Sequence, residues 1–154
     1  SRSEQGGIIK DGAKMVNAVA NSVVPKFTFI LGNSYGAGNY AMCGKAYDPR
    51  MIFAWPSAQI AVMGGDQAAK TLMQIQVSAL EKQGKVIDPV EKERILAEIS
   101  GRYERQMSPY YAAARLWTDG IINPEDTRRI ISTGIEMADQ NPEVREFKTG
   151  VLQV

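Results

Sequence analysis

Apolar residues recur at helical spacing near the start of the chain and then give way to short runs that are apolar throughout. Between residues 9 and 23 the apolar positions are three or four residues apart, which predicts an amphipathic helix that ends before Pro25. Residues 26–31 are β-branched and aromatic and are apolar on both faces, which is typical of a covered strand. The chain is therefore expected to begin with a helix followed by a buried strand that leads into Gly32.

The order of strand, glycine turn and helix occurs twice along the sequence. After the first strand, residues 37–43 leave room for only two helical turns before Gly44. Two further strands are predicted at 51–55 and 59–63, joined by a tight connection, and a second glycine turn follows them. Asp66 is expected to cap the next helix. The positions expected to be buried on this helix are Ala68, Leu72, Ile75 and Ala79.

The second half of the chain is predicted to be mainly helical. Three pairs place a capping residue before a proline suited to the first helical position: Asp88-Pro89, Ser108-Pro109 and Asn123-Pro124. The last of these helices is expected to bury Thr127, Ile131, Gly134 and Ala138. No flexible linker interrupts the chain, so no domain boundary is predicted.

Composition excludes several classes of partner. The 154 residues carry a net charge of +1, so the chain lacks the positive electrostatic field that would attract nucleic acid or an anionic membrane surface. A single cysteine, Cys43, rules out an internal disulfide framework or a zinc site made of several cysteines, and no metal site is expected. No apolar run approaches the ~20 residues of a membrane span, and no signal-peptide pattern is evident. A cytoplasmic protein is expected, or a mitochondrial matrix protein if the source is eukaryotic.

The glycine-rich stretch at residues 32–44 reads GNSYGAGNYAMCG, and its first part resembles the nucleophile elbow of serine hydrolases. Gly32, Ser34 and Gly36 satisfy the G-x-S-x-G pattern. That chemistry requires a histidine as general base, and the sequence contains none. The hydrolase interpretation therefore fails, unless a lysine or another subunit supplies the base.

Two phosphate-binding interpretations of the same stretch are also incomplete. Residues 36–41 match G-x-G-x-x-A, but residues 55–59 contain no acid to bind a ribose hydroxyl. A phosphate loop would need one residue fewer between Gly38 and Gly44, and Lys45 followed by serine or threonine. What remains from the residues alone is an oxyanion hole of backbone N–H groups, or glycines that serve only tight packing.

Four blocks of sequence carry a resemblance to a known family. They are GIIKDGAKMV at 7–16, SYGAGNYAMCG at 34–44, WPSAQIAVMGGDQAA at 55–69 and DGIINPEDTR at 119–128. Together they resemble the carboxyltransferase (beta) subunits of biotin-dependent acyl-CoA carboxylases. The block at 34–44 is most similar to the methylcrotonyl-CoA and geranyl-CoA carboxylase branch.

The resemblance implies an α/β fold built as a crotonase-like spiral of β-β-α units. Residues 1–154 would form the C-terminal part of the domain, within the second carboxyltransferase half and with a helical C-terminal portion. The chain is then a fragment of a longer subunit. Its partners would be the missing N-terminal half, a second beta subunit in a homo-oligomer, and a biotin carboxylase and biotin carrier subunit.

The resemblance also implies a reaction and a site. Carboxyl transfer would run from carboxybiotin on its carrier to an acyl-CoA thioester, and the amides of Gly36 and Ala37 would hold the biotin carbonyl. Biotin itself would take the substrate proton, so the lack of histidine would not matter. A bulky residue at either position should stop transfer while the fold persists. The other residues expected to bind substrate are Tyr35, Gly38, Asn39 and Tyr40.

Substrate choice within this family rests on few positions. Asn39 stands where propionyl-type relatives tend to carry aspartate, which favours a 3-methylcrotonyl-CoA-like substrate, although the block at 55–64 is shared with the propionyl-type enzymes. Tyr35 would limit acyl length, while ordinary aromatic packing is the alternative role for Tyr35 and Tyr40. Lys10, Lys14, Lys45 and Arg50 would meet CoA phosphates or simply lie in solvent.

Two other functions are compatible with the same resemblance. One is a non-catalytic crotonase-like subunit that serves assembly or binds acyl-CoA without turnover. The other is a biotin-dependent decarboxylase that runs the transfer in reverse, from a substrate such as glutaconyl-CoA. Cys43 is expected to be a small buried hydrophobe rather than a nucleophile, since no histidine is available to activate it.

Overall fold

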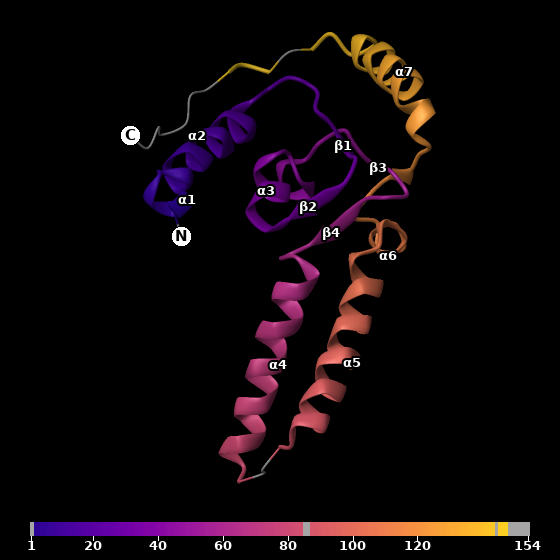
Figure 1. The fold of residues 1–154 in the computed structure, drawn as a ribbon. Helices are drawn as coiled ribbons and strands as arrows, with labels where there is room; N and C mark the ends of the chain where they lie inside the picture. Colours follow the sequence, from indigo (N-terminus) through magenta and orange to yellow (C-terminus); the bar gives the residue numbers. More distant parts are fainter. Residues whose placement is uncertain (1, 85–86, 144, 148–154) are drawn as a thin grey trace.

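A computed structural model describes residues 2–84, 87–143 and 145–147. Two small parallel sheets lie at its centre, and a pair of long helices projects from them (Figure 1). In chain order the elements are α1 (Arg2–Gln5), α2 (Ile8–Asn21), β1 (Phe27–Ile30), β2 (Asn33–Tyr35), α3 (Gly36–Ala41), η1 (Lys45–Tyr47), β3 (Met51–Ala54), β4 (Gln59–Ala61), α4 (Gly65–Lys82), α5 (Pro89–Met107), α6 (Pro109–Ala113), β5 (Gly120–Ile121), η2 (Pro124–Asp126) and α7 (Thr127–Asp139).

Successive strands along the chain alternate between two sheets. One sheet has the order β1-β3-β5 and the other pairs β2 with β4, all in parallel. The strands expected at 51–55 and 59–63 are confirmed, but they do not pair with each other. Trp55 N donates to Ile30 O at 2.9 Å and Gln59 N donates to Gly32 O at 3.1 Å. The segment that contains β3 and β4 therefore runs alongside the segment that contains β1 and β2.

The core of the sheets is small and aliphatic. Ile30, Ile52, Ala54 and Ala58 form one buried cluster, against which Ile60 of β4 packs. A short strand at β2 is an addition to the elements predicted from the sequence. Its residues are mostly polar, which hid its periodicity, and its pairing with β4 is what holds it extended.

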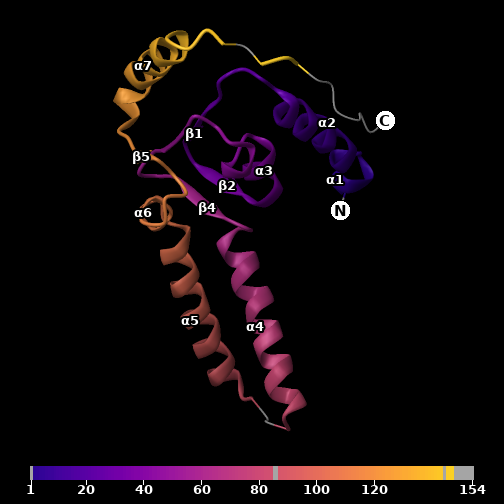
Figure 2. The ribbon, with the colours of Figure 1, turned by 180° about the vertical axis from the view of Figure 1, so that it is seen from behind.

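Helices α4 and α5 lie side by side and project away from the sheets in both views (Figure 2). Their contact is a second cluster of Ala69, Ile95 and Ile99. Leu72 and Ile75 are 41% and 61% exposed, so the prediction that they are buried is wrong.

The buried residues of α4 are Ala68, Ala69 and Val77, and Ala79 is exposed. Among the predicted positions only Ala68 is therefore buried. The reason is that α5 covers a single face of α4 and leaves the other faces open.

Of the four helix caps predicted from the sequence, two are confirmed. Asp88 accepts a hydrogen bond from Glu91 N at 2.7 Å, and Ser108 accepts one from Tyr110 N at 3.3 Å. Asp66 does not cap α4. The N-cap position belongs to Gly64, which is extended and whose carbonyl oxygen accepts a hydrogen bond from Ala68 N.

The region after Asn123 differs from the predicted helix start. A 3-10 turn comes first, without a side-chain cap, and α7 follows it. Gly134 is buried as expected, and a Cβ added there would lie 3.0 Å from the ring of Phe27. Ile131 is 42% exposed, which contradicts its predicted burial, and Thr127 and Ala138 are only partly buried.

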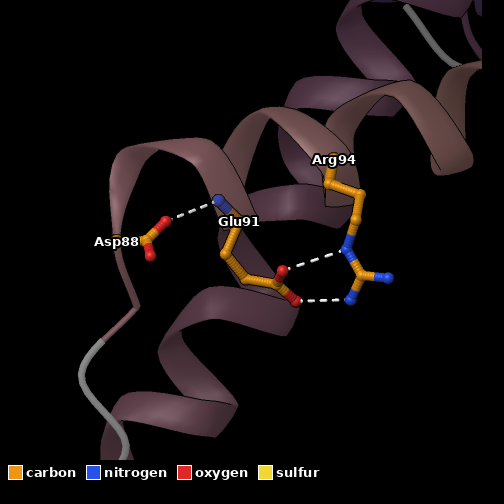
Figure 3. Close-up of polar contacts among 3 residues, drawn as sticks. All are labelled: Asp88, Glu91 and Arg94. Atoms are coloured by element: carbon orange, nitrogen blue, oxygen red, sulfur yellow. Dashed lines mark hydrogen bonds and ion pairs between the residues drawn. The ribbon is translucent and has the colours of Figure 1, made fainter.

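Figure 3 shows how α5 begins. Beyond the Asp88 cap, the Arg94 guanidinium donates to both carboxylate oxygens of Glu91, at 2.9 Å and 2.7 Å. These hydrogen bonds are the main reason why the pKa of Glu91 lies below its ordinary value. The ionised Glu91 therefore stabilises the fold at neutral pH, and this stabilisation is lost as the pH falls through the lowered pKa. The pair is exposed, and its contribution is correspondingly small.

We expect Asp88→Ala to destabilise α5 by about 1 kcal/mol, because the amide of Glu91 loses its acceptor. Asp88→Asn is the matched control, since it keeps an oxygen in the same place and should be close to the wild type. Amide hydrogen exchange in the first turn of α5 measures the difference. Equal exchange rates in the two variants would contradict the capping role.

Candidate functional site

The glycine-rich stretch folds as strand β2, a sharp turn at Gly36 and helix α3. Gly36 has a φ of 53°, in the left-handed region that glycine adopts without steric cost. A Cβ added there would lie 2.7 Å from the carbonyl oxygen of Val62, just beyond the end of β4. Both the dihedral angle and the space at this position therefore require glycine.

The turn opens α3 at a helix start that no side chain caps. The first N–H groups of a helix have no intrahelical acceptor. Among the described residues no side chain caps α3. Ala37 and Gly38 are exposed. An exposed helix start without a side-chain cap is a place where an oxygen that carries negative charge can bind.

The side chains around this turn are held by one another. Ser34 Oγ donates to Asn39 Oδ1 at 2.9 Å, and the Tyr35 hydroxyl donates to Gln59 Oε1. The serine of the apparent hydrolase elbow is therefore engaged with Asn39. Because β2 and β4 are paired, Tyr35 and Gln59 lie on neighbouring strands. Their hydrogen bond holds the Tyr35 side chain next to the turn.

Tyr40 packs edge-on against Tyr47, with ring centroids 4.9 Å apart, yet it remains 52% exposed. Burial, followed by the neighbouring Tyr40 and Cys43, raises the pKa of Tyr47 above its ordinary value. The phenol of Tyr47 therefore stays neutral at physiological pH, and no base is created at this place.

A pocket of about 270 Å³ lies between the sheets, α3 and η1. Its lining residues are Thr28, Ile30, Asn39, Tyr40, Lys45, Ala46, Ile52, Ile60 and Trp117. Asn39 and Tyr40 thus reach the pocket, whereas Tyr35, Gly36, Ala37 and Gly38 are not among its lining residues. The predicted site is divided between this pocket and the turn beside it.

Thr28 and Trp117 are among the lining residues of this pocket that are absent from the site expected from the sequence. Thr28 Oγ1 donates to Cys43 O at 2.8 Å and so ties β1 to the end of α3. Trp117 comes from the loop before β5, and the pairing of β3 with β5 brings that loop close. No local pattern in the sequence predicts this contact.

Lys45 is the one of the four candidate cations that lines this pocket. Its Nζ lies 3.6 Å from Asp119 Oδ1, and the other carboxylate oxygen of Asp119 accepts from Ile52 N at 2.7 Å. Lys14 pairs with Asp11 at 3.3 Å on the exposed side of α2. Lys10 and Arg50 are exposed.

Cys43 is buried and free, in line with its expected role as a small hydrophobe. Among the described residues no group of three or more histidine, cysteine, aspartate or glutamate side chains is placed to hold a metal ion. Within the same ranges, none of the helices combines the length and the apolar character needed to cross a membrane.

Comparison with known proteins identifies the family. The carboxyl transferase domain family matches residues 1–151. The chain belongs to this family. The resemblance to beta subunits of biotin-dependent acyl-CoA carboxylases is thereby confirmed, and with it the crotonase-like α/β fold.

Three similar proteins illustrate the match. The chain is 50% identical over 139 residues to the biotin-dependent 3-methylcrotonyl-coenzyme A carboxylase beta1 subunit of Mycobacterium tuberculosis, which covers 90% of this chain and 26% of that protein. It is 48% identical over 152 residues to the probable mitochondrial methylcrotonoyl-CoA carboxylase beta chain of Drosophila melanogaster, covering 99% of this chain and 26% of that one. The crystal structure of the Pseudomonas aeruginosa geranyl-CoA carboxylase beta subunit superposes with a TM-score of 0.78 at 40% identity, covering 100% of this chain and 28% of that chain. The chain therefore spans about a quarter of the length of its relatives.

We expect Gly36→Ala to destabilise the protein by about 2 kcal/mol or more, because an L-residue in the left-handed region costs ~1–2 kcal/mol and the contact with the Val62 carbonyl adds to it. This corrects the expectation that a bulky residue at 36 leaves the fold unchanged. Gly38→Ala is the matched control: a Cβ there meets no atom within 4 Å, and alanine favours the helix by up to ~1 kcal/mol. Urea unfolding measures both, and wild-type stability in Gly36→Ala would contradict the close approach.

Proposed function

We propose that residues 1–154 form the C-terminal part of an acyl-CoA carboxyltransferase domain, which transfers a carboxyl group from carboxybiotin to an acyl-CoA. Family membership and the names of the similar proteins support this reaction class. The turn at Gly36, which opens α3 without a side-chain cap, is the single observation that carries the mechanism. A 3-methylcrotonyl-CoA-like substrate is favoured, because two of these relatives act on methylcrotonyl-CoA by name.

The residues at the turn fit a carbonyl oxygen that gains negative charge. Glycine at 36 lets the backbone approach the Val62 carbonyl closely and turn into α3, and Ala37 beside it is exposed. When bound, carboxybiotin supplies the carboxyl group and a ring nitrogen basic enough to take the substrate proton. The amides of Gly36 and Ala37 hold the ureido oxygen and stabilise its charge, and by analogy each such donor contributes about 3–4 kcal/mol in the transition state. No histidine is needed, which agrees with a sequence that contains none.

The acyl-CoA is proposed to lie along the side chains beside the turn. Asn39 and Tyr40 line the pocket of about 270 Å³, and Tyr35 stands at the turn itself, where its hydroxyl is held by Gln59. Gly38 has no side chain, and the space that a Cβ would occupy there is open. Tyr35 is proposed to limit the length of the acyl group.

The remaining parts of the machinery are proposed from the relatives. The chain covers about a quarter of their length, so the N-terminal half of the subunit, a second beta subunit and a subunit that carries biotin would complete the site. The Drosophila relative is named as mitochondrial. A matrix location is proposed for this protein if its source is eukaryotic, and a cytoplasmic one otherwise.

We expect Ala37→Val to lower the rate of carboxyl transfer about a hundredfold in the full-length subunit, as loss of one oxyanion donor does in other enzymes, because side chains tilt toward the start of a helix and a branched one at 37 would crowd the amides there. Ala97→Val is the matched control, since Ala97 is an exposed residue of α5 away from the turn. Carboxylated biotin and a panel of acyl-CoAs are supplied, and the carboxylated product is measured. A rate for Ala37→Val equal to that of the control would refute the assignment of the amides.

The same assay separates the competing functions. Acyl-CoA binding with no carboxylated product from any member of the panel would point to a non-catalytic subunit. Carboxybiotin formed from a diacid thioester would point to a decarboxylase. Product formation from 3-methylcrotonyl-CoA in preference to propionyl-CoA is the result expected here.

A further inference from the structure

The hydroxyl of Tyr103 bridges two distant parts of the chain. Tyr103 belongs to α5, and its Oη donates to the carbonyl oxygen of Met63 at 2.9 Å. The same Oη accepts from the backbone N–H of Met63 at 3.4 Å. Both contacts are partly buried. One hydroxyl therefore satisfies both polar backbone groups of a residue that lies between β4 and α4.

The segment that Tyr103 holds is the one against which the glycine turn packs. Val62 directly precedes Met63, and its carbonyl oxygen lies 2.7 Å from the position that a Cβ of Gly36 would take. A Cβ at Gly64 would lie 3.8 Å from the ring of Tyr35. Residues 62–64 thus contact the turn on one side.

The other side of the same segment is packed against α5. A Cβ at Gly65 would lie 3.1 Å from the methyl group of Met107, which is buried at the end of α5. Tyr103 and Met107 are four residues apart and so share one face of that helix. The segment is therefore held between α5 and the Gly36 turn, with Tyr103 providing its polar contacts.

We propose that Tyr103 is a positioning residue for carboxyl transfer: through Met63 it fixes the Val62 carbonyl, and that carbonyl sets the place of Gly36 and Ala37. This inference rests on the proposed function of these two amides. An oxyanion donor is effective only when it is held in place before the reaction, and displacements below 1 Å weaken it. A hydroxyl that fixes the backbone beneath the donors acts on the rate without touching the substrate.

Tyr103→Phe in the full-length subunit tests this role, because it removes one oxygen and keeps the ring. The rate at saturating acyl-CoA is expected to fall about tenfold, while the acyl-CoA concentration for half-maximal rate stays unchanged. Tyr111→Phe is the matched control. Tyr111 contacts Trp117 and Arg115 through its ring, and among the described residues its hydroxyl makes no hydrogen bond. This control is expected to keep the wild-type rate.

The fraction of folded protein is measured by circular dichroism for each variant, so that the rate is expressed per folded subunit. A Tyr103→Phe rate per folded subunit equal to that of Tyr111→Phe, with Ala37→Val still slow, overturns the positioning role and leaves the proposed function in place. A wild-type rate in Ala37→Val overturns both. A fall in rate for Tyr103→Phe and Ala37→Val, with Tyr111→Phe unaffected, supports both.

Discussion

The close approach of Gly36 to the carbonyl of Val62 is the constraint on which the turn and the proposed site depend. It joins the end of β2 to the end of β4, and any side chain at 36 would push the two strands apart. The positive φ at Gly36 then directs the chain into α3 at once, so that the start of this helix faces outward without a cap. Packing and backbone conformation at the start of α3 thus depend on one contact between main-chain atoms.

The two sheets make this contact possible because the chain repeats the same step. β1 continues into β2 and β3 continues into β4, each by a short connection, and parallel pairing holds the two paths in register. Cross-links between the paths include Ser57 Oγ donating to Leu31 O at 3.2 Å. The second path ends at Val62, beside the turn made by the first. The proposed backbone site would therefore rest on strand register rather than on the placement of any reactive side chain.

The sequence predicted what local chemistry decides and missed what distant contacts decide. The helix starts at Asp88 and Ser108 follow from a capping residue before proline, and a glycine at 36 announced a tight turn. The burial of Ile75 was predicted wrongly, because the face of α4 that becomes buried depends on where α5 lies. Trp117 could not be placed at the pocket, since only the pairing of β3 with β5 brings it there.

The proposed site of main-chain donors has consequences for the pH dependence of the reaction. Amide N–H groups do not titrate in the physiological range, so in the proposed mechanism the hold on the ureido oxygen does not change with pH. The nearest phenol with a shifted pKa, that of Tyr47, is moved away from neutrality by burial and remains uncharged. With no histidine in the sequence, the described residues at the turn introduce no group that would switch charge near pH 7. Any pH dependence near neutrality in carboxyl transfer must then arise from the reacting groups or from other parts of the assembly.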